Sequence, residues 1–373
     1  MKVTIDQKKG AEALSIVSKA VASKDIVPIA AGIKIEASAG KLSFEATDLE
    51  RTIVNTINEA DDVKIQEDGQ CVIPGKYFTE FFRRLPDGEI GIETDGANAL
   101  LRYGLNETTI NGYPAEEFPE RNSIEAGTDI KVKATDLREA LNKVIYAADS
   151  KNKRPILNSV LFEFIKNGIA FVSSDSHRLA WTLIAVPGIK PGTQLVLPGK
   201  MINDFLKTSV PLDAEVQICS TENTASLKVD NLCFITRLIE DKFPNYKAVI
   251  PKSDSINLSY KANVAQIKGA VERASISKNG TNTVKIVHKH DTIEINSENE
   301  SGKINEIVPI SESSGESYHI AFNGKYLVEA LNAIETEEVF FRFSGARSPA
   351  LLLPFEEQKR SINLVLPIRI KEQ

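Results

Sequence analysis

A short phrase that occurs three times divides this chain into three segments of nearly equal length. It reads Pro-Gly-Lys at residues 74–76 and 198–200 and Asn-Gly-Lys at residues 323–325, and each copy opens an amphipathic helical pattern. The three lysines are separated by 124 and 125 residues. An interval of that length matches a whole domain and is too long for a solenoid repeat. The sequence therefore predicts one domain present three times, at residues 1–124, 125–249 and 250–373.

Other landmarks follow the same interval. Phe118-Pro119 recurs as Phe243-Pro244, and Thr47-Asp48 recurs as Ser174-Asp175. The third copy is more diverged and carries Ser297-Glu298 at the corresponding place. Several landmarks in the same order support triplication more strongly than a single shared tripeptide would.

Each repeat combines two helical patterns with many alternating, strand-like segments. Segments 33–36 and 291–295 alternate apolar and polar residues, which is typical of half-buried strands. Apolar residues recur at helical spacing in six places, residues 7–24, 74–84, 134–154, 199–209, 261–278 and 323–334. Two helices packed on an antiparallel sheet in every repeat is an α+β architecture, and this is the fold class that we predict.

The composition is that of an ordinary globular protein, and we expect a cytoplasmic location. The first residues lack the apolar core of a signal peptide, and no apolar run approaches the roughly 18 residues of a membrane span. Cys71, Cys219 and Cys233 are an odd, unclustered set in apolar segments. We expect them to be reduced thiols with a structural role.

Charge is distributed unevenly along the chain. The formal net charge is −6, which alone argues against tight, site-specific nucleic-acid binding. The six helical patterns are nevertheless positive in sum, so the remainder of the chain is strongly acidic. Lysines that are merely solvated on amphipathic helices would explain this for any single helix. A basic surface within an acidic protein would instead guide a polyanion to one place.

Three segments resemble one known family. They are Val-Ser-Ser-Asp-Ser-His-Arg-Leu-Ala at residues 172–180, Leu-Ile-Glu-Asp-Lys-Phe-Pro-Asn-Tyr at 238–246, and Leu-Val-Leu-Pro-Ile-Arg-Ile at 364–370. Together with the threefold repeat and the length, they make the whole chain similar to bacterial sliding clamps, the beta subunits of DNA polymerase III. The resemblance implies three clamp domains that form half of a closed, homodimeric ring around duplex DNA. Such a ring is a processivity factor of DNA replication that tethers the replicative polymerase of the DNA polymerase III holoenzyme.

A size argument that does not use the family also favours two chains. Six helices in a circle, spaced about 9.5 Å apart, would leave a free hole of only about 8 Å. Twelve helices would leave about 26 Å on the same arithmetic, which admits B-form DNA with a layer of water. A head-to-tail contact that closes after two subunits would produce that ring.

Double-stranded DNA is the expected partner of the basic surface. A ring that holds DNA by closure needs only weak, phosphate-directed contacts that ignore sequence. The resemblance assigns such contacts to Lys24, Lys151, Lys153 and Arg154. On charge alone we add the following nine positions: Lys8, Lys9, Arg83, Arg84, Arg138, Lys143, Lys200, Lys207 and Arg273.

The resemblance also implies a hydrophobic groove between the middle and last domains. In the family it accepts short linear peptides of the replicative polymerase catalytic subunit, the clamp loader, and repair and translesion polymerases. The matching positions here are Leu157, Ser174, Ser176, His177, Arg178, Leu179, Pro244, Val249, Leu364, Val365, Leu366, Pro367, Ile368 and Arg369.

The residues themselves partly support a groove. The last segment is very apolar, and Pro367 restricts it to a sheet edge or a strand end. We expect Arg178 and Arg369 at the rim, and an ordinary last strand is the alternative. Ala248 and Ser176 depart from common family residues, as does the extension at residues 371–373.

The seam of the ring should join the first domain of one chain to the third domain of the other. Ile110 and Ile276 match apolar interface positions of the family. Thr108 and Ser277 stand where larger apolar residues are usual, which predicts a more polar seam.

We predict no enzymatic activity, cofactor or metal site, and no membrane association. Asp175, Ser176 and His177 are triad residue types, but neighbours on a strand point to opposite faces and cannot relay a proton. The Pro-Gly-Lys phrases lack the glycines and Ser or Thr of a phosphate loop. His288 and His290 could share a strand face, and we expect them to be solvated rather than bound to metal. An enzyme using the Asp175–His177 segment, or a protein-binding scaffold that does not encircle DNA, are the competing hypotheses.

Overall fold

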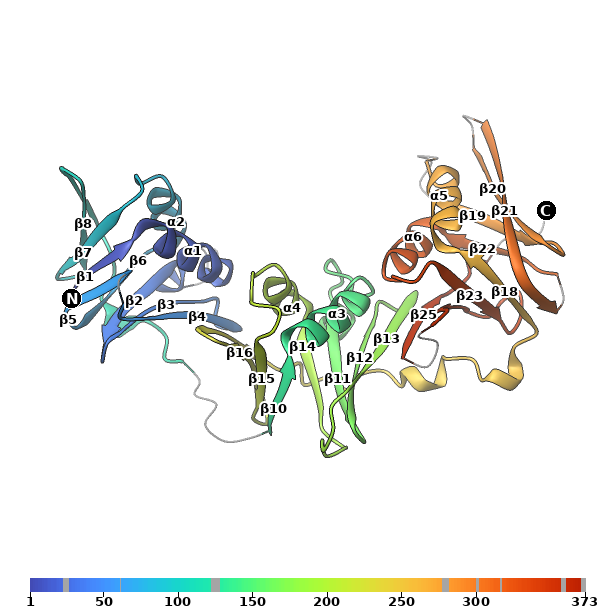
Figure 1. The fold of residues 1–373 in the computed structure, drawn as a ribbon, viewed down its shortest axis with the longest axis horizontal. Coiled ribbons are helices and arrows are strands. Elements are labelled where there is room, and N and C mark those ends of the chain that lie inside the picture. Colours follow the sequence, from blue (N-terminus) through green and yellow to red (C-terminus); the bar gives the residue numbers. More distant parts are fainter. Residues whose placement is uncertain are drawn as a thin grey trace. The chain divides into compact units, whose positions relative to one another are not determined.

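The computed structural model describes residues 1–22, 27–60, 62–121, 128–276, 282–299, 302–315, 317–356 and 360–369. The chain divides into two compact units, whose helices and strands are labelled in Figure 1. Unit 1 comprises Met1–Thr135 and Asp204–Leu238, and unit 2 comprises Asp136–Asn203 and Ile239–Gln373. The middle repeat thus contributes strands to both units, and each unit is described by itself.

Unit 1 contains a five-stranded and an eight-stranded antiparallel sheet in its described part. The five-stranded sheet has the order β5-β1-β7-β8-β9, and the eight-stranded sheet has the order β10-β15-β16-β17-β4-β3-β2-β6. Their bounds are β1 Lys2–Asp6, β2 Gly32–Ser38, β3 Lys41–Thr47, β4 Arg51–Asn58, β5 Val63–Glu67, β6 Gly69–Pro74, β7 Glu89–Asp95, β8 Asn98–Tyr103, β9 Asn106–Ile110, β10 Thr128–Lys133, β15 Glu215–Ser220, β16 Thr224–Val229 and β17 Leu232–Arg237.

Unit 2 contains a twelve-stranded sheet in its described part, with the order β14-β11-β12-β13-β25-β24-β23-β18-β21-β20-β19-β22. The bounds are β11 Ser159–Ile165, β12 Gly168–Ser174, β13 Arg178–Ala185, β14 Gln194–Pro198, β18 Leu258–Asn263, β19 Thr283–His288, β20 Thr292–Asn299, β21 Gly302–Gly315, β22 His319–Asn323, β23 Glu338–Phe343, β24 Ala350–Pro354 and β25 Ser361–Val365.

These sheets are continuous from one repeat to the next. In unit 1, β17 of the middle repeat pairs antiparallel with β4 of the first, with Thr236 opposite Arg51. In unit 2, β13 of the middle repeat pairs with β25 of the last, with Arg178 opposite Val365. Backbone hydrogen bonds between strand edges therefore join the repeats, and this satisfies edges that would otherwise be exposed.

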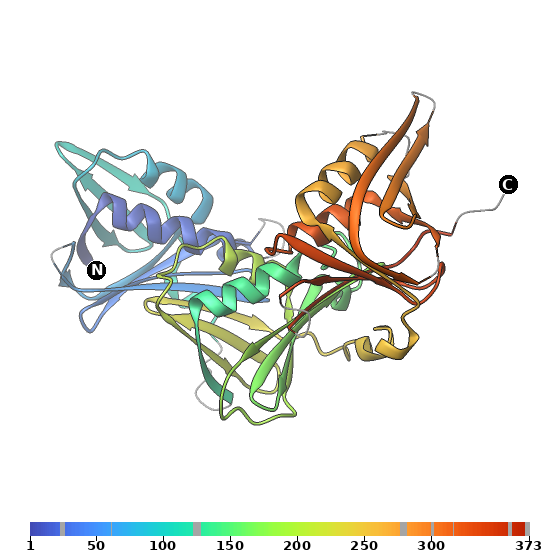
Figure 2. The same ribbon diagram turned by 45° about the vertical axis from the view of Figure 1, so that its right-hand side comes forward.

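The six predicted helices all form, and each is shorter than its sequence pattern. The bounds are α1 Gln7–Val17, α2 Gly75–Arg83, α3 Ala134–Ile145, α4 Gly199–Leu206, α5 Val264–Ala274 and α6 Gly324–Asn332. Side chains fix three of the starts, because the carboxylate of Asp6 and the amides of Asn263 and Asn323 accept hydrogen bonds from first-turn N–H groups. In Figure 2, α1 and α2 lie together over strands of the first repeat, and α5 and α6 do so in the last. The α+β prediction is confirmed.

Close packing explains the glycine of the recurring phrase. A β-carbon at Gly75 would lie 2.7 Å from Cγ2 of Val21, and one at Gly324 would lie 2.0 Å from Oγ of Ser275. Val21 and Ser275 both follow the first helix of their repeat. The second helix therefore begins in contact with the end of the first, and only glycine leaves room for it.

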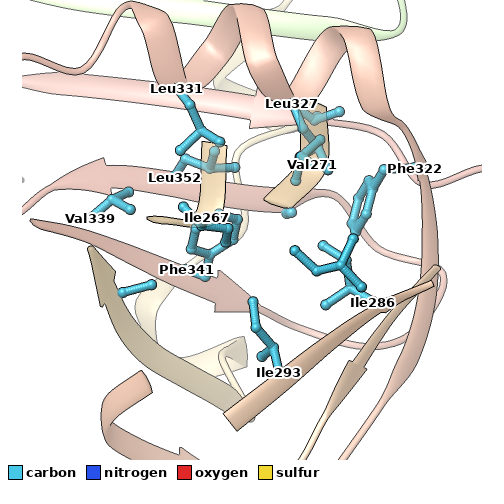
Figure 3. Packing of buried hydrophobic residues seen from close by; sticks show 14 of the residues in the cluster. Ile267, Val271, Ile286, Ile293, Phe322, Leu327, Leu331, Val339, Phe341 and Leu352 are labelled. Carbon is cyan, nitrogen blue, oxygen red and sulfur yellow. The ribbon is translucent and has the colours of Figure 1, made fainter. Parts of the chain in front are cut away.

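A large core lies in the last repeat, where apolar side chains of α5 and α6 pack against those of the sheet (Figure 3). Ile267 and Val271 from α5, and Leu327 and Leu331 from α6, pack onto Phe341 and neighbouring strand residues. Phe341 is 1% exposed. This burial is the main source of stability for the helices, which are too short to persist alone.

His288 does not lie on a solvated surface, so that prediction is wrong. Its side chain is 5% exposed, stacks on the buried ring of Tyr260, and places Nε2 2.8 Å from the hydroxyl of Ser313. Burial lowers the pKa of the imidazole. No cluster of three or more metal-ligating side chains occurs among the described residues.

The three cysteines are free thiols, as predicted. Burial raises the pKa of the Cys71 thiol to about 12 and that of Cys233 to about 11, so both are weak nucleophiles at neutral pH. No helix in the described part of the chain has the length and apolar character needed to cross a membrane.

Replacing Gly324 with alanine is expected to destabilise the protein by about 1–3 kcal/mol, because the new methyl group displaces Ser275. Movement of Ser275 would also break the hydrogen bond that its hydroxyl donates to the carbonyl of Val271 at 2.6 Å. Gly269→Ala in α5 is the matched control, since its nearest contact is the flexible end of Arg273 at 3.2 Å. That variant should be as stable as the original or more so by up to about 1 kcal/mol. Urea unfolding of both variants measures the difference, and equal midpoints would contradict this account.

Candidate functional site

A rigid elbow joins β12 to β13 in unit 2. The hydroxyl of Ser174 donates to the carbonyl of Arg178 at 2.8 Å, and the N–H of Ser176 donates to that hydroxyl at 3.3 Å. One carboxylate oxygen of Asp175 accepts from the backbone N–H groups of His177 and Arg178, at 2.8 and 3.0 Å. Ser176 has φ 75°, in the left-handed region. This network presents Ser176 and His177 at the surface and turns Arg178 inward.

Arg178 lies in a buried charge cluster and does not form the rim of the groove, so that part of our prediction is wrong. Its side chain is 7% exposed, and its Nε donates to Asp175 at 2.9 Å while another nitrogen pairs with Glu329 of α6. The guanidinium carbon lies 4.6 Å from the ring centre of Tyr326 and 5.4 Å from that of Tyr146. Opposite charges and aromatic faces compensate its desolvation.

The last strand completes the site, as the position of Pro367 predicted. β25 ends at Val365, and the next N–H, that of Leu366, donates to the carbonyl of His177 at 2.9 Å. The N–H of Ile368 then donates to the carbonyl of Ala321 at 2.7 Å. The segment therefore leaves the sheet beside the elbow and continues along the last repeat.

The predicted groove residues divide into two groups. Leu179 and Leu364 are buried in one cluster with Phe243 and Tyr246, and Leu157 and Val365 are also buried. Val249, Leu366 and Ile368 are large apolar side chains that are 50%, 37% and 38% exposed. Ser174 and Pro367 are half-buried, and Ser176, His177, Pro244 and Arg369 are exposed. Apolar side chains at the surface, next to exposed polar ones, suit the capture of an apolar peptide.

The connector between the middle and last repeats is fixed beside this surface. The hydroxyl of Tyr246 donates to Glu163 at 2.5 Å, and the amine of Lys247 pairs with the same carboxylate at 2.8 Å. The N–H of Val249 donates to the carbonyl of Tyr246 at 3.2 Å. Val249 is thus held by a tethered turn.

Nothing in this arrangement forms a hydrolytic triad. The Asp175 carboxylate is taken up by two backbone N–H groups and by Arg178. The ring of His177 instead stacks on Tyr326, with 6.1 Å between ring centres. A general base needs its imidazole within hydrogen-bonding reach of both partners, and these contacts do not provide that.

Ten of the basic residues predicted to contact DNA have exposed side chains, and the other three are described in the next paragraph. Lys151, Lys153, Arg154, Lys200 and Lys207 have exposed side chains. Five others are exposed but paired with carboxylates: Lys8 with Asp87, Lys9 with Asp62, Arg83 and Arg84 with Glu80, and Arg273 with Glu306. Exposed pairs of this kind are worth at most about 1 kcal/mol, so a phosphate group can displace them.

Three of the predicted positions need separate comment. Lys143 is buried at 7% exposure and pairs with Glu139 and Glu335, so its assignment as a free phosphate contact is wrong. Arg138 is half-buried. Lys24 lies outside the described residues, and so does Ser277 of the predicted seam.

Sequence reasoning missed Tyr146, Tyr326 and Glu329, which enclose Arg178. A signal for Glu329 was present, because an acidic residue follows each recurring lysine by four positions, as Glu80, Asp204 and Glu329. Asp204 pairs with the buried Arg51 in unit 1 just as Glu329 pairs with Arg178 in unit 2. The third repeat lacks the Asp-x-x-Arg sequence, since Glu298 and Ser301 stand at the positions of Asp175 and Arg178.

Replacing Arg178 with methionine is expected to destabilise unit 2 by about 3 kcal/mol, because Asp175 and Glu329 would lose their buried counter-charge. Arg273→Met is the control, since Arg273 lies in the same unit, its side chain is exposed, and loss of its pair with Glu306 should change stability by less than about 1 kcal/mol. Chemical denaturation followed by tryptophan fluorescence reports on unit 2 through Trp181. Similar losses for both variants would refute the buried cluster as a structural element.

Comparison with known proteins identifies the family. The models for the N-terminal, central and C-terminal domains of the DNA polymerase III beta subunit match residues 1–122, 131–245 and 247–369. Beta sliding clamps of Staphylococcus aureus and Staphylococcus epidermidis are each 28% identical, over 94% and 99% of both chains. The sliding clamp of Bacillus subtilis has 30% identity and a TM-score of 0.93 with complete coverage of both chains, and the beta subunit of Thermotoga maritima has 27% and 0.90. The chain belongs to the DNA polymerase III beta subunit family.

Proposed function

We propose that this protein is the sliding clamp of a bacterial DNA polymerase III, a non-catalytic processivity factor that encircles duplex DNA as a homodimer. Similarity over the full length to named sliding clamps supports the proposal. The observation that carries it is the edge pairing between repeats, β17 with β4 and β13 with β25. A protein built to bind peptides alone would not need sheets that extend from one repeat into the next.

The two edges equivalent to these pairs lack a partner in the described chain. β9 pairs only with β8, and the Gly302–Pro309 half of β21 pairs only with β20. β9 is the last strand of the first repeat, as β17 and β25 are of theirs. A second copy that joins its β9 to this half of β21 would continue the same pairing, and a heterologous contact that closes makes a ring.

Exposed apolar side chains near these edges support the seam. Ile276, Ile307 and Leu105 are large apolar residues with high exposure, at 70%, 62% and 105%. Ile110, in contrast, is 4% exposed, so its side chain supports β9 from the core while the strand edge is available for pairing.

Within such a ring the DNA is held by closure. The exposed cations Lys151, Lys153, Arg154, Lys200 and Lys207 would meet phosphates without reading bases. The exposed pairs, such as Lys8 with Asp87, would supply further charge once a phosphate displaces the carboxylate. Contacts of this kind permit movement along the duplex.

The exposed apolar surface beside the elbow would recruit partners. We propose that Leu366, Ile368 and Val249, with His177 and Arg369 at the rim, dock linear peptides. The expected partners are the catalytic subunit of the replicative polymerase, the clamp loader, and repair and translesion polymerases. The alternative hypothesis, a protein-binding scaffold that does not encircle DNA, includes this docking surface but no ring.

Retention on DNA separates these hypotheses. After loading by a clamp loader and ATP, the labelled protein should elute with nicked circular plasmid and be lost when a single cut linearises it, because only closure holds it. Equal retention on both forms would contradict encirclement. An Ile276→Asp/Ile307→Asp variant should sediment as a monomer and be retained on neither form, since two charges would face a desolvated seam.

Leu366→Asp tests the docking surface. It places a charge where an apolar peptide side chain would lie, and affinity for a fluorescent peptide from the replicative polymerase should fall at least about tenfold. Leu212→Asp is the control, because Leu212 is 66% exposed and belongs to unit 1. Anisotropy titration measures both, and an equal effect would show that the surface is misplaced.

A further inference from the structure

The first elbow of the chain repeats the geometry of the peptide-docking elbow. In unit 1 the hydroxyl of Thr47 donates to the carbonyl of Arg51 at 3.0 Å, and the N–H of Leu49 donates to that hydroxyl at 3.1 Å. Asp48 accepts from the N–H of Arg51 at 3.0 Å and pairs with its Nε at 2.9 Å. Leu49 has φ 74°, against 75° for Ser176. The two elbows therefore share one backbone design.

The adjoining strand is also placed in the same way. The N–H of Arg237, at the end of β17, donates to the carbonyl of Glu50 at 2.9 Å. This bond is the counterpart of that from Leu366 to His177, also 2.9 Å. A depression of about 280 Å³ lies over this first elbow, and its walls include Leu49, Glu50, Pro119, Glu120, Ile235 and Arg237.

Leu49 is unusual in both conformation and exposure. A left-handed backbone costs a non-glycine residue about 1–2 kcal/mol, and Leu lacks the short polar side chain that eases it in Asn. The side chain gains little packing in return, since it is 40% exposed. The protein thus maintains a strained elbow that presents an apolar side chain to the mouth of the depression.

The depression carries two carboxylates and the guanidinium of Arg237 at positions where the docking surface has neither kind of charged group. Glu50 takes the place of His177, and Glu120 takes the place of Asn245, at intervals of 127 and 125 residues. Both carboxylates are exposed, and neither has an ion-pair partner among the residues that the structure describes. Arg237, in place of Leu366, adds N–H donors that suit the carbonyl groups of an extended peptide.

We propose that this first-junction depression is a second peptide-docking site, which takes a linear segment of a partner protein with a Lys or Arg beside an apolar residue. The apolar residue would pack on Leu49, and the cation would pair with Glu50 and Glu120. The two carboxylates, which the other docking surface lacks at the equivalent positions, make the two sites selective for different peptides. The proposal goes beyond the proposed function, because it depends neither on ring closure nor on the Leu366 surface.

The test begins with phage-displayed random heptapeptides selected on the full-length His177→Ala/Leu366→Asp variant, in which the other docking surface is impaired. The expected consensus places Lys or Arg next to an apolar residue. Affinity of the selected peptide is then measured by anisotropy on the otherwise original chain. It should fall at least about fivefold in Glu50→Lys/Glu120→Lys and in Leu49→Asn.

Leu49→Asn separates docking from folding. Asn tolerates the left-handed conformation, so this variant should melt no lower than the original chain while losing the peptide. Selection of no peptide, of peptides without a basic residue, or of peptides that bind Leu49→Asn equally well would overturn the proposal. Retention on circular DNA should be unchanged in Glu50→Lys/Glu120→Lys and in Leu49→Asn, so failure of the second site is distinguishable from failure of the clamp function.

Discussion

Pairing of strand edges between repeats, with a buried arginine behind each pair, is the interaction on which the rest of the structure depends. β17 continues onto β4 and β13 onto β25, and next to each pair Arg51 or Arg178 binds its own Asp and an acid from a later helix. A sheet edge can slide in register, but a buried cation with two fixed carboxylates allows one alignment. The buried charge cluster thus fixes the alignment of the paired strands, and backbone hydrogen bonds hold the strands together.

The same cluster gives the proposed docking surface its stiffness. His177 and Ser176 project from an elbow whose backbone is held by Asp175, and the ring of His177 rests on Tyr326, which also contacts Arg178. A peptide would therefore meet side chains that are already ordered, and little entropy is lost on docking. Function at this surface follows from the way the repeats are joined.

Much of the fold could be predicted from the sequence, because a triplicated phrase and helical spacing survive divergence. The helices at residues 7–17 and 324–332 lie where their patterns placed them, and β25 ends at Val365, shortly before Pro367. The orientation of Arg178 could not be predicted, since a partner 151 residues away, Glu329, turns it inward. The burial of Lys143 could not be predicted either, and the side chain pairs both with Glu139 of its own helix and with Glu335 of a different repeat. Local pattern identifies elements, whereas partners distant in sequence decide which charges reach solvent.

The third repeat lacks the Asp-x-x-Arg sequence of the other two, and this affects where the proposed dimer would open. Separating β17 from β4, or β13 from β25, would deprive the buried guanidinium of Arg51 or Arg178 of both its carboxylate partners. At the proposed seam, the third repeat has Ser301 in its sequence where the other repeats have Arg51 and Arg178. Loading onto circular DNA would require the proposed ring to open reversibly at one place. Because the third repeat has diverged, the weakest of the three contacts would be the one between the two chains.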